Sequence, residues 1–181
     1  MIKITSGKYK GRYLKLPDTK NTRPTMEKVR QAVFSALKDK CINAVCLDLF
    51  AGSGAMGLEA LSRGAKRVYF NDKDPSVFKT LKENVSSIEE DEDAFKLYKC
   101  DFRLFLKKDF GETFDIVFLD PPYRFDVNKD VIGEMAKRNL LSEDAVMVSE
   151  QNFRNREIDG FEIKEYEYGE KYVALYRRNK A

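Results

Sequence analysis

The sequence predicts an α/β protein in which a mostly parallel sheet is covered by helices on both faces. From residue 44 to residue 150, short apolar runs alternate with helical patterns, which is typical of parallel strands joined by crossover helices. The end differs, because residues 161–168 and 171–178 flank Gly169-Glu170 and read as a hairpin. The last strand should therefore run antiparallel to its neighbours. A length of 181 residues fits a single domain.

A basic N-terminal extension, residues 1–40, precedes this alternation. Two alternating segments, IKIT and RYLKLP, lie on either side of the glycine-containing SGKYKG, which predicts a β-hairpin over residues 2–17. A helix over about residues 25–40 follows, with Thr25 in the N-cap position. The apolar stripe of this helix consists of Val29, Val33, Phe34 and Leu37.

The rest of the chain divides into strands and helices by the same patterns. Apolar runs predict strands over residues 44–50, 67–72, 94–100, 114–120 and 144–150. Helical patterns predict helices over residues 54–63, 75–88, 102–108 and 128–140. Gly64 ends the first of these helices and Pro75 opens the second, positions that suit these two residues.

Composition removes several classes of function. The chain has no histidine, which excludes Ser-His-Asp catalysis and histidine-based metal hydrolysis. Its three cysteines form no Cys-x-x-Cys pair, which argues against a disulfide framework or a thiolate metal site. No apolar run approaches the roughly 18 residues of a membrane span, and the basic start lacks the apolar region of a signal peptide. We expect a cytoplasmic protein that binds neither membrane nor metal.

Positive charge is concentrated in the N-terminal extension. Residues 1–40 hold eleven Lys or Arg against three Asp or Glu, whereas residues 41–181 hold twenty-two against twenty-seven. Tyr9 and Tyr13 lie among these cations, and such a mixture suits nucleic acid, where cations meet phosphates and rings stack on bases. A solvated charged segment is the alternative.

A glycine-rich loop follows the first predicted strand of the sheet. Gly52, Gly54 and Gly57 have a Gly-x-Gly-x-x-Gly spacing at a strand-to-helix turn, where a backbone without Cβ atoms can approach a nucleotide closely. Asp72, at the end of the next strand, is placed to bind ribose hydroxyls. The alternatives are a tight turn for the glycines and a helix N-cap role for Asp72 or Asp74.

Asp48, at the end of the strand before this loop, favours a ligand without phosphate. A pyrophosphate on the loop would lie near its carboxylate, and unpaired like charges there would be costly. S-adenosylmethionine carries no phosphate, offers an ammonium that Asp48 can pair with, and has a sulfonium that an acidic pocket tolerates. The sequence therefore favours this methyl donor over a dinucleotide.

A second motif, Asp120-Pro121-Pro122-Tyr123, follows the fourth predicted strand, at the edge where open α/β sheets bind ligands. Its two prolines fix φ and remove two donors, so the loop offers acceptors and one ring. Asp120 and the Pro121 carbonyl can accept the two N–H bonds of an exocyclic amino group while Tyr123 stacks on the base. An acidic turn with an exposed tyrosine is the alternative.

Four segments of the chain together carry a resemblance to a known family: GKYKGRYLKLP, TRPTMEKVRQAVFSAL, DLFAGSGAMGLEALSRGA and LDPPY. Through them, nearly the whole chain resembles the RsmD-type methyltransferases. Members modify the N2 amino group of a guanine in 16S ribosomal RNA. The resemblance implies a Rossmann-like class I S-adenosylmethionine-dependent methyltransferase fold, whose seven-stranded, mostly parallel sheet has an antiparallel last strand. It implies one methyltransferase domain over residues 1–181 and a partner that is 16S rRNA or the small ribosomal subunit. We expect a monomer.

The resemblance also implies roles for individual residues. The methionyl part of S-adenosylmethionine would be surrounded by Asp48, Phe50, Gly52, Ser53 and Gly54. Asp72 would hold the ribose, Asp101 would accept from the adenine amino group, and Phe102 would lie beside the adenine ring. The guanine would be held by Asp120, Pro121, Pro122 and Tyr123. An N-cap role for Asp101 at the helix over 102–108 is the alternative, and it is compatible with adenine binding.

The implied reaction is direct transfer of the methyl group to the amine nitrogen. A guanine inside a helix cannot reach the loop, so the target must be unpaired or flipped. Cations of the N-terminal extension would hold the surrounding RNA, with Lys8, Lys10, Arg12, Arg23 and Arg30 as candidates. A surface charge without RNA contact is the alternative for each.

Three rival functions remain. A DNA adenine-N6 or cytosine-N4 methyltransferase would use the same kind of catalytic loop, but 181 residues leave little room for a separate sequence-reading domain. An NAD-dependent oxidoreductase is disfavoured by Asp48. A non-catalytic RNA-binding module is disfavoured by the intact glycine loop, Asp72 and the Asp-Pro-Pro-Tyr motif.

Overall fold

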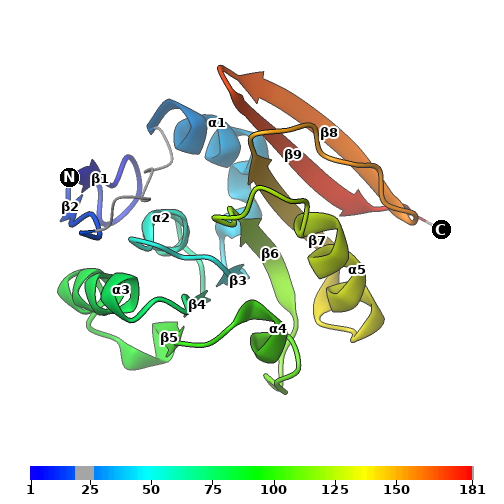
Figure 1. Cartoon of the computed structure of the whole chain (residues 1–181). Helices are drawn as coiled ribbons and strands as arrows, with labels where there is room; N and C mark the ends of the chain where they lie inside the picture. The colour runs from blue at the N-terminus through cyan, green and yellow to red at the C-terminus, as the bar shows by residue number, and fades with distance from the viewer. Residues whose placement is uncertain (19–26, 181) are drawn as a thin grey trace.

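A seven-stranded sheet forms the centre of the computed structural model, which describes residues 1–18 and 27–180 (Figure 1). The strands are β3 (Val45–Asp48), β4 (Arg67–Asn71), β5 (Phe95–Tyr98), β6 (Phe114–Leu119), β7 (Leu141–Gln151), β8 (Phe161–Tyr168) and β9 (Lys171–Arg178). Their order is β5-β4-β3-β6-β7-β9-β8. Strands β3 to β7 pair in parallel, and β9 pairs antiparallel with both β7 and β8. The predicted fold class, including its antiparallel last strand, is confirmed.

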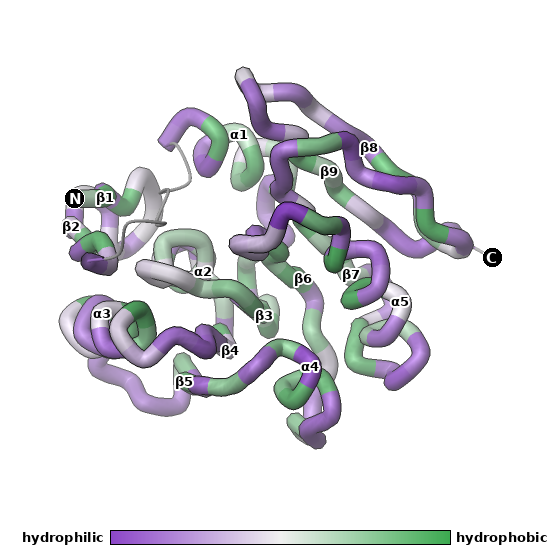
Figure 2. The backbone as a smooth tube through the Cα atoms, viewed as in Figure 1, coloured by the Kyte–Doolittle hydropathy of each residue, from purple (hydrophilic) through white to green (hydrophobic). Residues whose placement is uncertain are grey.

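Helices cover both faces of this sheet, as Figure 1 shows. One face carries α1 (Glu27–Leu37), α2 (Ala55–Ser62) and α3 (Pro75–Ile88), and the other carries α4 (Phe102–Phe105) and α5 (Asn128–Lys137). Each face has its own hydrophobic cluster, so the strands between them are buried on both sides. Figure 2 shows this as hydrophobic residues along β3 and β6, whereas much of β8 is hydrophilic.

The N-terminal hairpin forms and packs as part of the core. Its strands, β1 (Ile2–Lys3) and β2 (Tyr13–Leu14), are short and antiparallel, with Ile2 opposite Leu14. Ile2, Ile4 and Leu14 are buried in the same hydrophobic cluster as α1, α2 and α3. The extension is therefore built into the body of the protein, although its charge alone suggests a separable segment.

Some element boundaries differ from the sequence-based expectations. The predicted helix over 25–40 is α1 followed by a 3-10 helix, η1 (Lys38–Cys41), and Thr25 lies outside the described residues. Helix α5 ends at Lys137, since Asn139 adopts a left-handed conformation with φ 55°. Strand β7 begins at Leu141, three residues earlier than predicted, because Leu141 is buried and pairs with Phe114.

Two shorter elements complete the chain. Helix α4 covers only the first half of the predicted 102–108 segment. A second 3-10 helix, η2 (Glu92–Ala94), lies in the acidic run before β5. Of the helices formed by residues 1–18 and 27–180, none is both long and apolar enough to cross a membrane.

Candidate functional site

The glycine loop and the Asp-Pro-Pro-Tyr loop lie side by side. They follow β3 and β6, which are neighbouring parallel strands with Asp48 opposite Phe118. The strand order reverses between these two strands, and such a switch point is where open α/β sheets bind ligands. Phe50 and Tyr123 lie 6.1 Å apart between ring centroids, with their planes at 90°. The two predicted loops thus share one edge of the sheet.

A third loop, between β5 and α4, joins them. The Phe102 ring lies 5.3 Å from the Phe50 ring and 6.0 Å from the Tyr123 ring. These three rings come from segments that are far apart in sequence, and each is half-buried. The structure therefore brings together residues to which the family resemblance gives methionyl, adenine and base contacts.

The three glycine positions of the loop favour glycine for different structural reasons. Gly52 and Gly54 have φ of 57° and 87°, values that favour glycine. A Cβ on Gly52 would point into open space, whereas one on Gly54 would lie 2.8 Å from Leu81 Cδ1. A Cβ on Gly57 would lie 2.3 Å from Phe70 Cε1, so this glycine allows α2 to pack closely on β4. Of the three glycines, Gly52 is the one whose missing Cβ leaves the backbone facing open space.

Asp48 is buried at the base of the glycine loop. It is 4% exposed, and its Oδ2 accepts a hydrogen bond from the Gly57 backbone N–H at 3.0 Å. The pKa of Asp48 is raised to about 8, mainly by burial and to a smaller extent by the nearby charges of Asp120 and Asp72, although the Gly57 hydrogen bond opposes the shift. Three carboxylates thus face one region of the site, which favours a bound cation and disfavours a phosphate.

Asp72 supports the glycine loop from the end of β4. Its Oδ2 accepts from Gly52 N–H and its Oδ1 from Asp74 N–H, both at 3.0 Å. Burial raises the pKa of the Asp72 carboxyl above its ordinary value, although the two backbone hydrogen bonds oppose this. The N-cap of α3 is Asp74, whose Oδ1 accepts from Ser76 and Val77. Of the two acids considered as N-caps, Asp74 has that role.

Asp101 caps α4, which is the alternative role that the sequence allowed. Its Oδ1 accepts from Arg103 N–H at 2.8 Å and from Arg103 Nε at 2.9 Å. The Arg103 side chain lowers the pKa of Asp101 to about 2, so this carboxylate is ionised at neutral pH. Phe102 follows directly and forms part of the ring cluster described above.

Sequence reasoning missed Asn84, which links the glycine loop to the N-terminal hairpin. This buried α3 residue donates from Nδ2 to the Ser53 carbonyl at 2.8 Å and to the Lys15 carbonyl at 2.9 Å. Its Oδ1 accepts from the Lys15 backbone N–H at 2.8 Å. The sequence does indicate that Asn84 faces the core, because it lies in helical register with the apolar residues Leu81 and Ile88, which are buried.

Lys73 was also missed, and it lies beside the Asp-Pro-Pro-Tyr loop. Its Nζ lies 5.2 Å from the centroid of the Tyr123 ring, within the range of a cation–π contact. A hydrogen bond with the Tyr123 side chain raises the pKa of Lys73. The rim of the site therefore carries a positive charge although its floor is acidic.

The side chains of the candidate RNA-binding cations differ in exposure and in the contacts they make within the protein. Lys10 is exposed, Lys8 lies 3.6 Å from Glu89, and Arg12 donates to the Ser87 carbonyl at 2.6 Å. Arg23 lies outside the described residues. The prediction that Arg30 contacts RNA is wrong for this structure, in which it is 1% exposed.

Arg30 instead belongs to a buried ion pair. Its Nε lies 3.3 Å from Glu59 Oε1, and its Nη2 donates to the Lys3 carbonyl at 2.6 Å. Glu59, on α2, also accepts from the backbone N–H groups of Thr5 and Ser6. The guanidinium therefore fastens α1 and the hairpin to α2.

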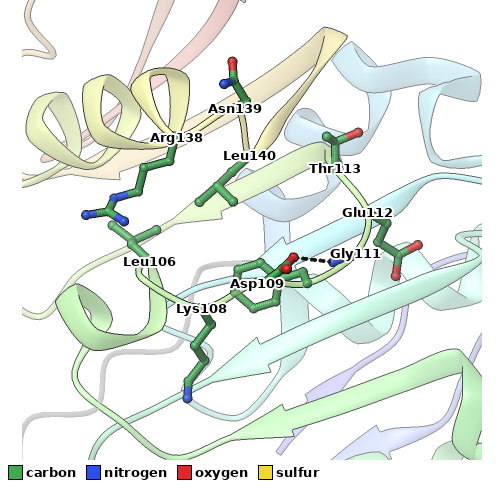
Figure 3. Close-up of a pocket in the computed structure, with 10 residues that line it drawn as sticks. Leu106, Lys108, Asp109, Gly111, Glu112, Thr113, Arg138, Asn139 and Leu140 are labelled. Atoms are coloured by element: carbon green, nitrogen blue, oxygen red, sulfur yellow. Dashed lines mark hydrogen bonds between the residues drawn. The ribbon is translucent and has the colours of Figure 1, made fainter.

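A separate pocket of about 460 Å³ lies at the amino ends of the strands, near the starts of β6 and β7 and away from the site (Figure 3). Asp109 accepts there from Gly111 N–H at 3.0 Å. The lining contains none of the residues assigned to the site. Among the described residues, no group of three or more Cys, Asp or Glu side chains is arranged to hold a metal ion.

Comparison with known proteins identifies the family. Residues 2–177 match the model of a family described as conserved hypothetical protein 95. The chain belongs to this family. Relatives named "Ribosomal RNA small subunit methyltransferase D" include one from Haemophilus influenzae, 34% identical over 150 residues that cover 82% of this chain and 78% of the relative. One from Escherichia coli is 34% identical over 154 residues, which cover 85% and 76%. The resemblance to the RsmD-type methyltransferases is confirmed.

Two solved structures have the same fold as this chain. A protein of Escherichia coli described as a candidate methyltransferase superimposes with a TM-score of 0.87 at 30% identity, covering 98% of this chain and 97% of that one. A candidate methylase of Haemophilus influenzae gives a TM-score of 0.83 at 30% identity, covering 99% of both chains. Both likenesses extend over the N-terminal hairpin as well as the sheet.

Proposed function

We propose that this family member transfers the methyl group of S-adenosylmethionine to the exocyclic N2 amino group of a guanine in small-subunit ribosomal RNA. The observation that carries the proposal is the meeting of the glycine loop and the Asp-Pro-Pro-Tyr loop, with Phe50 and Tyr123 6.1 Å apart. The names of the relatives support rRNA of the small subunit as the substrate. The choice of guanine N2 rests on the resemblance to the RsmD-type enzymes.

The residues present fit S-adenosylmethionine better than a nucleotide with phosphates. Asp72 and Asp120 lie near enough to Asp48 for their charges to raise its pKa in addition to the main effect of burial, so the floor of the site is acidic. When bound, S-adenosylmethionine supplies a methyl group on a positively charged sulfur. Asp48 and the loop 52–54 would hold its methionyl part, Asp72 its ribose, and Asp101 with Phe102 its adenine. The oxygens of Asp72 that accept from the backbone each retain a second lone pair for a hydroxyl.

The Asp-Pro-Pro-Tyr loop would prepare the amino group of the base. The Asp120 carboxylate and the Pro121 carbonyl accept its two hydrogens, which localises the nitrogen lone pair and directs it toward the methyl group. Tyr123 stacks on the base, and Pro121 and Pro122 keep the loop rigid. As the carbon–nitrogen bond forms and the carbon–sulfur bond breaks, Asp120 accepts the proton that the nitrogen releases.

RNA would approach over the hairpin and the rim of the site. Lys10 is exposed on the hairpin, and Lys8 and Arg12 also reach the surface. These cations meet phosphates without reading the sequence, so they would position the RNA while the loop selects the base. The target guanine must leave its stack to reach Asp120.

A transfer assay tests the proposal. The protein is incubated with labelled methyl donor and with small subunits or 16S rRNA that lack the modification, beside duplex DNA as the rival substrate. We expect label in the rRNA at one guanine and none in the DNA. Label in DNA adenine or cytosine would favour the rival function, and donor binding without any transfer would favour a non-catalytic module.

An Asp120→Ala variant tests the assigned role of the loop. We expect it to bind S-adenosylmethionine as the unsubstituted protein does and to lose turnover, because the amino group loses one of its two acceptors. Binding is measured by calorimetry and turnover by label transfer. Normal turnover in this variant would refute the role of Asp120.

A further inference from the structure

We propose that Phe125 is a second stacking ring of the substrate site and that its outer face binds the nucleotide next to the target guanine. This inference rests on the proposed function and extends it to a residue outside the Asp-Pro-Pro-Tyr motif. It concerns how the RNA is held while one base is presented to Asp120.

Phe125 is unusual in its exposure. The chain has thirteen phenylalanines, all within the described parts of the chain, and Phe125 is the only exposed one, at 65%. A ring that lies mostly in water contributes little to the core, so the fold does not explain its presence. An exposed aromatic ring beside a candidate substrate site is available to a ligand.

The Phe125 ring continues the stack that begins at Tyr123. The two ring centroids lie 5.2 Å apart with an angle of 21° between the planes, which is an offset parallel arrangement. A base that stacks on the face of Tyr123 opposite Phe125 would therefore have two protein rings beneath it. The next planar group in this stack would lie on the outer face of Phe125.

Positive charges surround these rings. Lys73 Nζ lies 5.2 Å from the Tyr123 centroid, and the Arg103 guanidinium carbon lies 5.4 Å from the Phe102 centroid. Arg124, between Tyr123 and Phe125, is exposed. Rings flanked by cations are the arrangement by which proteins hold single-stranded nucleic acid, because the rings take bases and the cations take phosphates.

The spacing fits a displaced base. Stacked rings are separated by about 3.4 Å, as successive bases are in a helix, so two inserted rings would hold the target and its neighbour about 10 Å apart. Proteins that unstack bases commonly insert apolar side chains at the step they open. Tyr123 and Phe125 would thus keep the neighbour in place while the target guanine reaches Asp120.

Three variants test this assignment, each with label transfer to rRNA and calorimetry of methyl-donor binding. Phe125→Ala removes the ring, and Phe125→Trp keeps a planar face. Ile42→Ala is the matched control, because Ile42 is also an exposed apolar residue, at 57%, but precedes β3 at the opposite edge of the sheet. Thermal denaturation confirms that each variant folds.

We expect Phe125→Ala to raise KM for rRNA by about 5- to 150-fold, the range for loss of one base–ring stack, with unchanged donor affinity. Phe125→Trp should restore KM to within about threefold, and Ile42→Ala should leave it unchanged. An unaltered KM in Phe125→Ala, or an equal effect of Ile42→Ala, would overturn the inference alone. If the unsubstituted protein transfers no methyl group to rRNA, the proposed function fails, and this inference fails with it.

Discussion

Replacing Asp48 with asparagine should stabilise the free protein while weakening its binding of the methyl donor. Asp48 is 4% exposed, and its carboxyl loses contact with water on folding. Asparagine has the same shape and keeps an oxygen for the Gly57 N–H, so the hydrogen bond at 3.0 Å can persist. The substitution therefore removes a buried ionisable group without opening a cavity.

The size of the effect follows from the pKa of Asp48. Burial raises this pKa from 3.8 to about 8. A group whose pKa is raised by folding contributes stability at pH values below its unfolded pKa, and that contribution is lost as the pH rises through the folded pKa. One pKa unit corresponds to about 1.4 kcal/mol, so the loss is at most about 4 kcal/mol at pH 7 and about 6 kcal/mol above pH 8.

The assay is urea denaturation of both proteins between pH 4 and pH 9. The two free energies of unfolding should agree near pH 4 and diverge as the pH rises, with the asparagine variant the more stable. Asp115→Asn is the control, because the Asp115 carboxylate accepts from Val45 N–H at 2.8 Å at the far end of the same strand pair. That variant should stay within about 1 kcal/mol of the unsubstituted protein, as expected for an isosteric change at a partly exposed site.

Donor binding provides the second half of this test. An ionised Asp48 attracts the cationic donor, so its affinity for the unsubstituted protein should fall as the pH drops below about 8. The asparagine variant should bind more weakly, with little dependence on pH. Parallel stability curves from pH 4 to pH 9, or a variant that is less stable throughout, would refute the reasoning, because Asp48 would then be a structural residue.

Three further substitutions test other contacts. Asn84→Ala should lower the free energy of unfolding by about 2 kcal/mol and raise the Kd for S-adenosylmethionine, because the Ser53 carbonyl loses its buried hydrogen-bond partner. Urea denaturation measures the first effect and calorimetry the second. An unchanged Kd would contradict the link between Asn84 and the glycine loop. Glu59→Gln should lower the free energy of unfolding by about 3–5 kcal/mol, because Arg30 is left buried without its charge partner. Urea denaturation measures this loss, and an unchanged free energy of unfolding would contradict the expectation. Lys10→Ala should reduce the slope of log affinity for RNA against log salt by about 1, and an equal slope would show that Lys10 contacts no phosphate.

The motifs of this chain predict which loops lie next to one another, because each motif belongs to one short turn. The spacing of Gly52, Gly54 and Gly57 reflects local backbone angles and the contact of α2 with β4. Asp48 ends β3 and Tyr123 follows the neighbouring strand β6, so the alternation of strands and helices is enough to place them at the same end of the sheet.

Residues whose partners are distant in sequence escape this kind of reasoning. Arg30 reads as one more cation of the basic extension, because nothing near it reveals Glu59, 29 residues away. Asn84 reads as one polar residue of α3, although it contacts Lys15 and Ser53. A count of charged residues likewise does not show that the N-terminal hairpin packs into the core. Deleting residues 1–20 would therefore disturb the fold as well as RNA binding, so single surface substitutions are the better test.

The most direct measurement of the central claim is the chemical identity of the product. rRNA is incubated with a donor that carries a deuterated methyl group, digested to nucleosides and examined by mass spectrometry, with Asp120→Ala as the comparison. The account predicts one deuterated N2-methylguanosine per RNA with the unsubstituted protein and none with the variant. A deuterated methyl group on adenine N6 or cytosine N4, or equal yields from the two proteins, would contradict it.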